Sequence, residues 1–109
     1  MSIPVDLPDL ERIMDDFTDV FLIFVNESGK PRVLSIDPAR ANETLTFEAG
    51  ARTVAAIANN PNVTVFLPPG AGKGLALIID GAATSAGGPI TITPTSAVLH
   101  RTRTPPSTK

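Results

Sequence analysis

The sequence predicts a mainly β protein, a small antiparallel barrel of six strands with two short helices. Short runs rich in β-branched and aliphatic residues recur along the 109 residues, separated by turns of Gly, Pro and Asn. Only two stretches show helical spacing of apolar residues. A parallel sheet would need a helix in each crossover, whereas closing an antiparallel sheet removes its exposed edges. An antiparallel barrel is therefore the predicted architecture.

Residues 1–18 are expected to contain a helix that covers one end of the barrel. Asp6 can cap this helix, and Pro8 suits its first turn. Four apolar residues then follow at helical spacing and form one stripe: Leu10, Ile13, Met14 and Phe17.

The first three strands are expected at residues 20–25, 32–36 and 44–49. The first is an unbroken apolar run, which is typical of a strand buried on both faces. The third alternates between apolar and polar residues, as a half-buried strand does. A short helix over residues 51–58 follows and ends before Pro61, because proline cannot continue a helix.

A fourth strand is expected at residues 63–67. A fifth is expected from residue 73 or 74 to residue 80. Gly81 is expected to form a bulge in it, and residues 82–86 can extend it. The last strand, over residues 90–93 and 97–101, is interrupted by Pro94. We therefore expect a single domain over residues 1–101 and a disordered tail at 102–109.

Charge and composition argue against several classes of partner. Residues 1–50 carry ten acids and four bases, and residues 51–109 carry one acid and five bases. Phe is the only aromatic type present, so a basic face with aromatic platforms for nucleic acid is not expected. No apolar run approaches the roughly 20 residues that span a bilayer, and we expect no secretory signal, because the N-terminus has no basic region followed by an apolar region. We expect no nucleic-acid or membrane partner and a cytoplasmic location, which the absence of cysteine fits.

Three potential motifs do not meet the requirements of their chemistry. PPGAGKG at 68–74 lacks the first glycine and the final Ser or Thr of a phosphate-binding loop, and a strand follows it; Lys73 could still approach a bound anion. His100 is the only histidine and there is no cysteine, so no zinc site is predicted. No G-x-S-x-G elbow accompanies His100, which we expect at the surface or an interface.

Arg32 and Arg52 are the strongest candidates for a binding site. Arg52 follows Gly50 at the start of a predicted helix, where free backbone N–H groups favour an anion. An arginine at such a position can form two parallel hydrogen bonds to a phosphate. The alternative is that each is a surface arginine paired with a carboxylate such as Glu48 or Asp37. The placement of both arginines at element starts favours a holder for a phosphorylated cofactor.

Residues 20–101 resemble the FMN-binding split-barrel family, that of pyridoxamine 5'-phosphate oxidase and its small relatives. The similar segments are RVLSI at 32–36, LTFEAGARTV at 45–54, IANNPNV at 57–63, IIDGAA at 78–83 and ITP at 92–94. The resemblance implies a six-stranded antiparallel split β-barrel. It also implies a homodimer that holds the cofactor in a groove between two subunits.

The family's functional residues carry over to several positions. The resemblance implies that Arg32 and Arg52 hold the flavin phosphate, with Thr53 where lysine is usual. It further implies that backbone groups of Ser35, Phe47 and Glu48 line the edge of the flavin ring. The implied cofactor is FMN, or alternatively coenzyme F420, and the implied activity is hydride transfer to or from a small molecule. No catalytic residue is identified.

Three departures weaken the match to the oxidase itself. Thr53 removes one positive charge, although its hydroxyl can still donate to phosphate. Asp37 stands where the oxidase has lysine, and Ala76 where it has glutamine. A non-enzymatic split-barrel dimer with a degenerate or empty pocket therefore remains the alternative.

Overall fold

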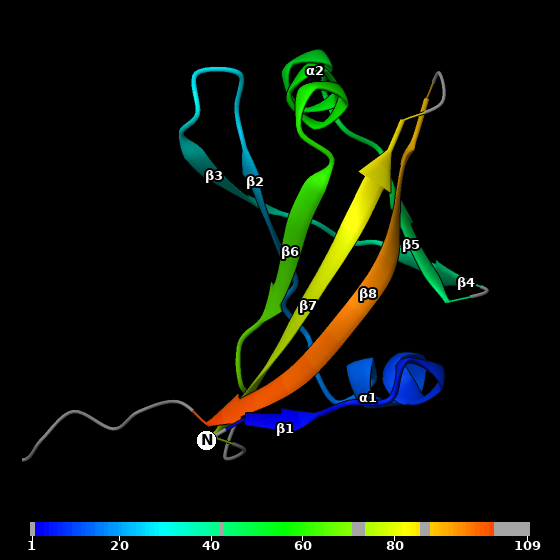
Figure 1. Cartoon of the computed structure of the whole chain (residues 1–109). Helices are drawn as coiled ribbons and strands as arrows, with labels where there is room; N and C mark the ends of the chain where they lie inside the picture. The colour runs from blue at the N-terminus through cyan, green and yellow to red at the C-terminus, as the bar shows by residue number, and fades with distance from the viewer. Residues whose placement is uncertain (1, 42, 71–73, 86–87, 102–109) are drawn as a thin grey trace, which may run out of the picture.

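The computed structural model describes residues 2–41, 43–70, 74–85 and 88–101, and Figure 1 shows them as one curled sheet with short helices at its two ends. The elements in chain order are β1 (Ser2–Pro4), the 3₁₀ turn η1 (Leu7–Asp9), α1 (Leu10–Met14), β2 (Phe21–Val25), β3 (Pro31–Ser35), β4 (Ala39–Ala41), β5 (Thr44–Phe47), α2 (Ala51–Asn59), β6 (Asn62–Leu67), β7 (Leu75–Thr84) and β8 (Ile90–Arg101). No described helix has the length and apolar character needed to cross a membrane.

The strands form one antiparallel sheet in the order β3-β2-β6-β7-β8-β5-β4, with β1 paired to β8. The predicted class, mainly β and antiparallel with two short helices, is confirmed. The predicted strand number is not, because the described residues contain eight strands rather than six. The additional strands, β1 and β4, have three residues each and form only by pairing with β8 and β5. The sheet curls into a half-barrel, with β3 and β4 at its two ends.

The N-terminal segment differs in part from the covering helix that the sequence predicts within residues 1–18. Residues 2–4 pair with β8, and the helical part is limited to η1 and the five residues of α1. Leu10 and Met14 are buried in the core, so the predicted apolar stripe does face the sheet. Arg40 of β4 fixes this segment by donating to Glu11 O at 3.0 Å and pairing with Asp15 Oδ1 at 2.8 Å. The predicted disordered tail, 102–109, lies outside the described residues.

β7 and β8 form the long central pair of the sheet, and β8 runs without a break through Pro94. The register shifts between Asp80 and Gly81, which then lies opposite Pro94. A bulge removes the need for a regular ladder hydrogen bond at that point, so proline is accommodated inside the strand. The predicted bulge at Gly81 therefore explains why the predicted interruption at Pro94 does not occur.

Gly81 is expected to be essential to this pairing. A Cβ atom at Gly81 would lie 2.8 Å from Thr93 O and 2.9 Å from Ile92 Cγ2, and β8 would have to shift. We expect Gly81→Ala to lower the free energy of unfolding by about 1–3 kcal/mol, the range for overpacked cores. Gly88→Ala is the matched control, because a Cβ there meets nothing within 4 Å. Urea denaturation of both variants is the measurement, and equal stability would contradict the prediction.

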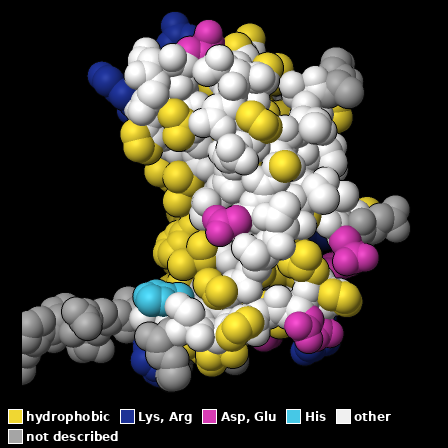
Figure 2. Space-filling view, in the orientation of Figure 1, with side chains coloured by type: hydrophobic (Ala, Val, Ile, Leu, Met, Phe, Trp, Pro, Cys, Tyr) yellow, Lys and Arg dark blue, Asp and Glu magenta, His cyan; other side chains and the backbone are white. Residues whose placement is uncertain are grey.

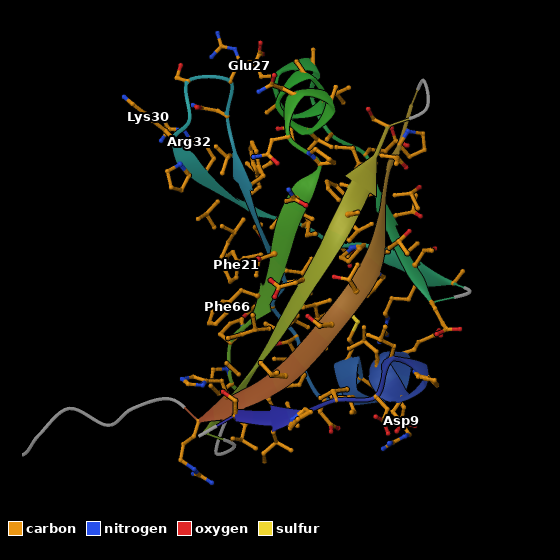
Figure 3. All side chains as sticks on the ribbon, in the orientation of Figure 1. Asp9, Phe21, Glu27, Lys30, Arg32 and Phe66 are labelled. Carbon is orange, nitrogen blue, oxygen red and sulfur yellow. The ribbon has the colours of Figure 1, made fainter. Side chains whose placement is uncertain are left out.

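The two faces of the sheet have different partners. The inner face carries the core, which includes Leu22 and Phe24 of β2 and Leu77 and Ile79 of β7. Helix α2 packs against this inner face through Ala56 and Ile57. The outer face carries a row of half-buried apolar residues that cross-strand pairing places side by side on β2, β6, β7 and β8: Phe21, Phe66, Ile78 and Val98. We call this row the outer apolar row; Figure 3 labels its two phenylalanines, and Figure 2 shows hydrophobic side chains gathered on that side.

Candidate functional site

A pocket of about 290 Å³ lies between the β2–β3 hairpin and the start of α2. Residues from three elements and one turn line it: Phe24, Asn26, Arg32, Val33, Leu34, Arg52 and Thr53. Three of the predicted site residues, Arg32, Arg52 and Thr53, are thus brought together from segments 20 residues apart in sequence. Figure 3 labels Arg32 at the start of β3, and Figure 1 shows β2 between this strand and α2.

The register of the β2–β3 hairpin decides which side chains face this pocket. Arg32 lies directly opposite Phe24, and Leu34 lies opposite Leu22. Since Phe24 and Leu22 are buried on the inner face, Arg32 and Leu34 share that face. Side chains alternate along a strand, so Val33 and Ser35 belong to the outer face. All five residues of β3 are exposed, as an edge strand allows.

The start of α2 forms the opposite wall of the pocket. Gly50 is extended and provides no side-chain cap, and the first hydrogen bond of the helix runs from Val54 N to Gly50 O at 3.0 Å. The preceding backbone N–H groups therefore have no partner within the helix. Arg52 is exposed, whereas Thr53 is only 9% exposed. A positive guanidinium and partly positive N–H groups meet at this end of the helix, which favours an anion.

Neither arginine is neutralised by the carboxylates that the sequence offered as alternatives. Among the described residues the ion pairs are Arg12–Asp9 at 3.7 Å and Arg40–Asp15 at 2.8 Å. The lining of the pocket contains two guanidinium groups and no carboxylate. Two unneutralised positive charges around one cavity favour an anionic ligand over a cationic or neutral one.

The remaining predicted site residues lie elsewhere or are not described. Ser35 is opposite Phe21 on the outer side of the hairpin. Phe47 is buried in the core and paired with Ile90, and Glu48 is exposed just beyond the end of β5. None of these three lines the pocket. Lys73 lies outside the described residues.

Four residues of the pocket were not predicted, namely Phe24, Asn26, Val33 and Leu34. Asn26 was identified only as part of a turn. The signal that could have found it is the hairpin register. If Arg32 faces the site, then its opposite residue Phe24 does so too, and Asn26 is the turn residue two positions beyond Phe24.

His100 lies far from these residues in the fold, at the β1 end of β8. Its Nδ1 lies 2.9 Å from Ser2 Oγ, and both residues are exposed. The part of the chain that the structure describes contains no group of three or more His, Cys, Asp or Glu residues that could hold a metal ion.

Comparison with solved structures identifies the fold. An F420 reductase is 17% identical, covers 80% of this chain and 94% of its own, and superposes with a TM-score of 0.68. The FAD binding protein from Mycobacterium smegmatis is 16% identical, with 92% and 99% coverage and a TM-score of 0.68. A protein related to general stress protein 26, of the pyridoxinephosphate oxidase family, from Clostridium acetobutylicum is 12% identical, with 89% and 91% coverage and a TM-score of 0.68. No protein-family model and no curated protein sequence matches the chain.

The fold is therefore that of the pyridoxamine 5'-phosphate oxidase-like split barrels, and the solved structures that share it include an F420 reductase and an FAD binding protein. This confirms, at the level of fold, the resemblance found in the sequence.

Proposed function

We propose that the pocket between β2–β3 and α2 holds the phosphate end of a flavin or deazaflavin cofactor, either FMN or coenzyme F420. The observation that carries the proposal is the convergence of Arg32, Arg52 and the buried Thr53 on one cavity that no carboxylate lines. Each arginine can donate two hydrogen bonds to phosphate oxygens, and the first N–H groups of α2 add further donors. The names of the solved neighbours, which include an F420 reductase and an FAD binding protein, are consistent with this cofactor class.

The size of the pocket suggests how such a cofactor lies. Sites that enclose a whole small molecule are about 300–1,000 Å³, so a cavity of about 290 Å³ is at the lower end of this range. The positive charges of the two arginines favour binding of the cofactor's phosphate end in this cavity. The ring is then left to extend along β3, past Val33 and Leu34, which are 61% and 37% exposed.

We further infer that two copies associate through the outer face of the sheet. Four large apolar side chains lie in contact range along the outer apolar row, and Val33 continues the apolar surface onto β3 beside Ile23. A contiguous apolar surface of this kind marks an interaction site. β3 then belongs to both the pocket and the subunit contact, because Arg32 and Leu34 lie on its inner face and Val33, which also borders the pocket, lies on its outer face. Because β3 is an edge strand, a partner on the outer face would reach the rim where the ring leaves the pocket and would cover the ring there.

The proposed activity is oxidoreduction of a small molecule in the cytoplasm. When bound, the flavin or deazaflavin supplies the hydride chemistry. The residues of this chain bind the phosphate, fix the cofactor against β3 and, in the dimer, exclude water from the ring. The second candidate is a non-enzymatic dimer with a degenerate pocket, which Thr53 favours because the usual lysine charge is missing there.

Titration of the purified protein with FMN, F420 and riboflavin, followed by absorbance and fluorescence, tests the proposal. Saturable binding of FMN or F420 at micromolar or lower concentration supports a cofactor site, and the tighter of the two names the subclass. FMN is expected to bind more tightly than riboflavin, which lacks the phosphate. Binding of neither FMN nor F420 to a folded protein would favour the degenerate pocket.

A further inference from the structure

Asn26 closes the turn between β2 and β3 and also lines the pocket. Its Oδ1 accepts hydrogen bonds from the backbone N–H groups of Ser28 and Lys30, both at 2.9 Å. The backbone of Asn26 completes the turn, donating to Lys30 O and accepting from Gly29 N at 2.9 Å each. Gly29 has a φ of 82°, a conformation that glycine adopts without strain. The amide of Asn26 is therefore held in one orientation by the turn.

Because the turn uses the oxygen of the amide, the NH₂ group is left to bind a ligand in the pocket. An asparagine side chain has an acceptor oxygen and an NH₂ group with two donors. Because two N–H groups point at the same side-chain atom, that atom has to be the oxygen, and the hydrogen-bond network fixes the assignment. Among the described residues, Nδ2 makes no hydrogen bond to the protein.

Asn26 belongs to the lining of the cavity that both arginines line. Asn26 comes directly after β2, two residues beyond Phe24, and Phe24 lies directly opposite Arg32. Arg52 and Thr53 complete the lining from the α2 side. The turn that Asn26 stabilises also leads into β3. It therefore determines the position of Arg32, the second residue of that strand.

We infer that Asn26 is a binding residue of the pocket: Nδ2 donates a hydrogen bond to an oxygen of the bound anionic group, while Oδ1 maintains the turn that positions Arg32. The inference rests on the proposed function, in which this pocket holds a cofactor phosphate. The Asn26 amide adds a neutral, directional donor to the two arginines. It therefore favours a group with several acceptor oxygens, such as phosphate, over a halide ion.

Asn26→Asp separates the two roles of this side chain. A carboxylate oxygen can still accept from Ser28 N and Lys30 N, and Asp is well suited to such turns, so the fold is expected to remain. The second carboxylate oxygen takes the place of the Nδ2 donor. A negatively charged acceptor would then face the bound phosphate. We expect FMN to bind at least about tenfold more weakly, since the loss of a hydrogen bond to a charged group lowers affinity by about tenfold or more. Riboflavin is expected to bind both proteins equally.

Asn59→Asp is the matched control, because it makes the same chemical change at an exposed position at the far end of α2. FMN affinity of this control is expected to stay within about twofold of the unsubstituted protein. Asn26→Ser is a second, uncharged variant whose hydroxyl can hold the turn but brings no amide donor. We expect it to weaken FMN binding by about tenfold, because the hydrogen bond that is lost is made to a charged group.

The outcomes distinguish this inference from the proposed function. If the unsubstituted protein binds neither FMN nor F420, both fail. If it binds FMN and Arg52→Ala weakens that binding while folded Asn26→Asp and Asn26→Ser do not, the pocket stands and the role of Asn26 is overturned. A loss that affects riboflavin as much as FMN would also overturn it, because the effect would then not involve the phosphate.

Discussion

Replacing both Arg32 and Arg52 by alanine is expected to remove the phosphate-dependent part of FMN binding and to leave the protein folded. Both side chains are exposed and line the pocket without a carboxylate partner, so their loss removes no described ion pair and opens no cavity in the core. Each charge-assisted contact contributes about 1.5–3 kcal/mol. The double variant is therefore expected to bind FMN at least about 100-fold more weakly.

Comparing FMN with riboflavin makes this prediction specific to the phosphate. The unsubstituted protein is expected to prefer FMN, and the double variant to bind both ligands with equal, weak affinity. Arg12→Ala is the matched control, since Arg12 is an exposed arginine on α1 with only a 3.7 Å pair to Asp9. A folded double variant that keeps the preference for FMN would show that the phosphate lies elsewhere.

Much of the sheet could be predicted because its strands carry strong local signals. The apolar run of β2, the alternation of β5 and the proline that follows α2 each specify an element within one or two residues of its observed bounds. β1 and β4 carry no such signal. Each has three residues and is stabilised only by pairing with a strand distant in sequence or across a turn, which composition does not reveal.

The candidate site could be predicted only in part, for a geometric reason. Arg32 and Arg52 stand at element starts, and their type alone indicates an anion site. Whether a strand residue faces the pocket depends on register, however, and a shift of one residue reverses its face. The side chain of Ser35 is an odd number of residues from Arg32 and lies on the other side of β3, whereas the predicted backbone contact of Ser35 to the flavin ring stays a prediction. Asn26 lines the pocket because of the pairing of β2 with β3, and the register of that pairing could not be read from the sequence.

The outer apolar row is expected to hold the second subunit, and Ile78→Asp is expected to separate the dimer. Ile78 lies at the middle of the row, directly opposite both Phe66 and Val98. In a two-fold contact the substitution occurs in both copies, so two carboxylates would be buried without partners. Leaving a buried charge unpaired costs about 3–5 kcal/mol. The dimer dissociation constant is thus expected to rise more than about 100-fold.

Thr84→Asp provides the matched control for this experiment. Thr84 lies on the same outer side of β7 as Ile78, an even number of residues away, but it is exposed and pairs with Thr91 rather than with an apolar residue. Sedimentation velocity over a range of protein concentrations is the measurement, with far-UV circular dichroism to verify folding. We expect the unsubstituted protein and Thr84→Asp to be dimers and Ile78→Asp to be a monomer. A dimeric Ile78→Asp would show that the subunits meet on another face, and the proposed covering of the flavin ring by the partner would then have no support from this surface.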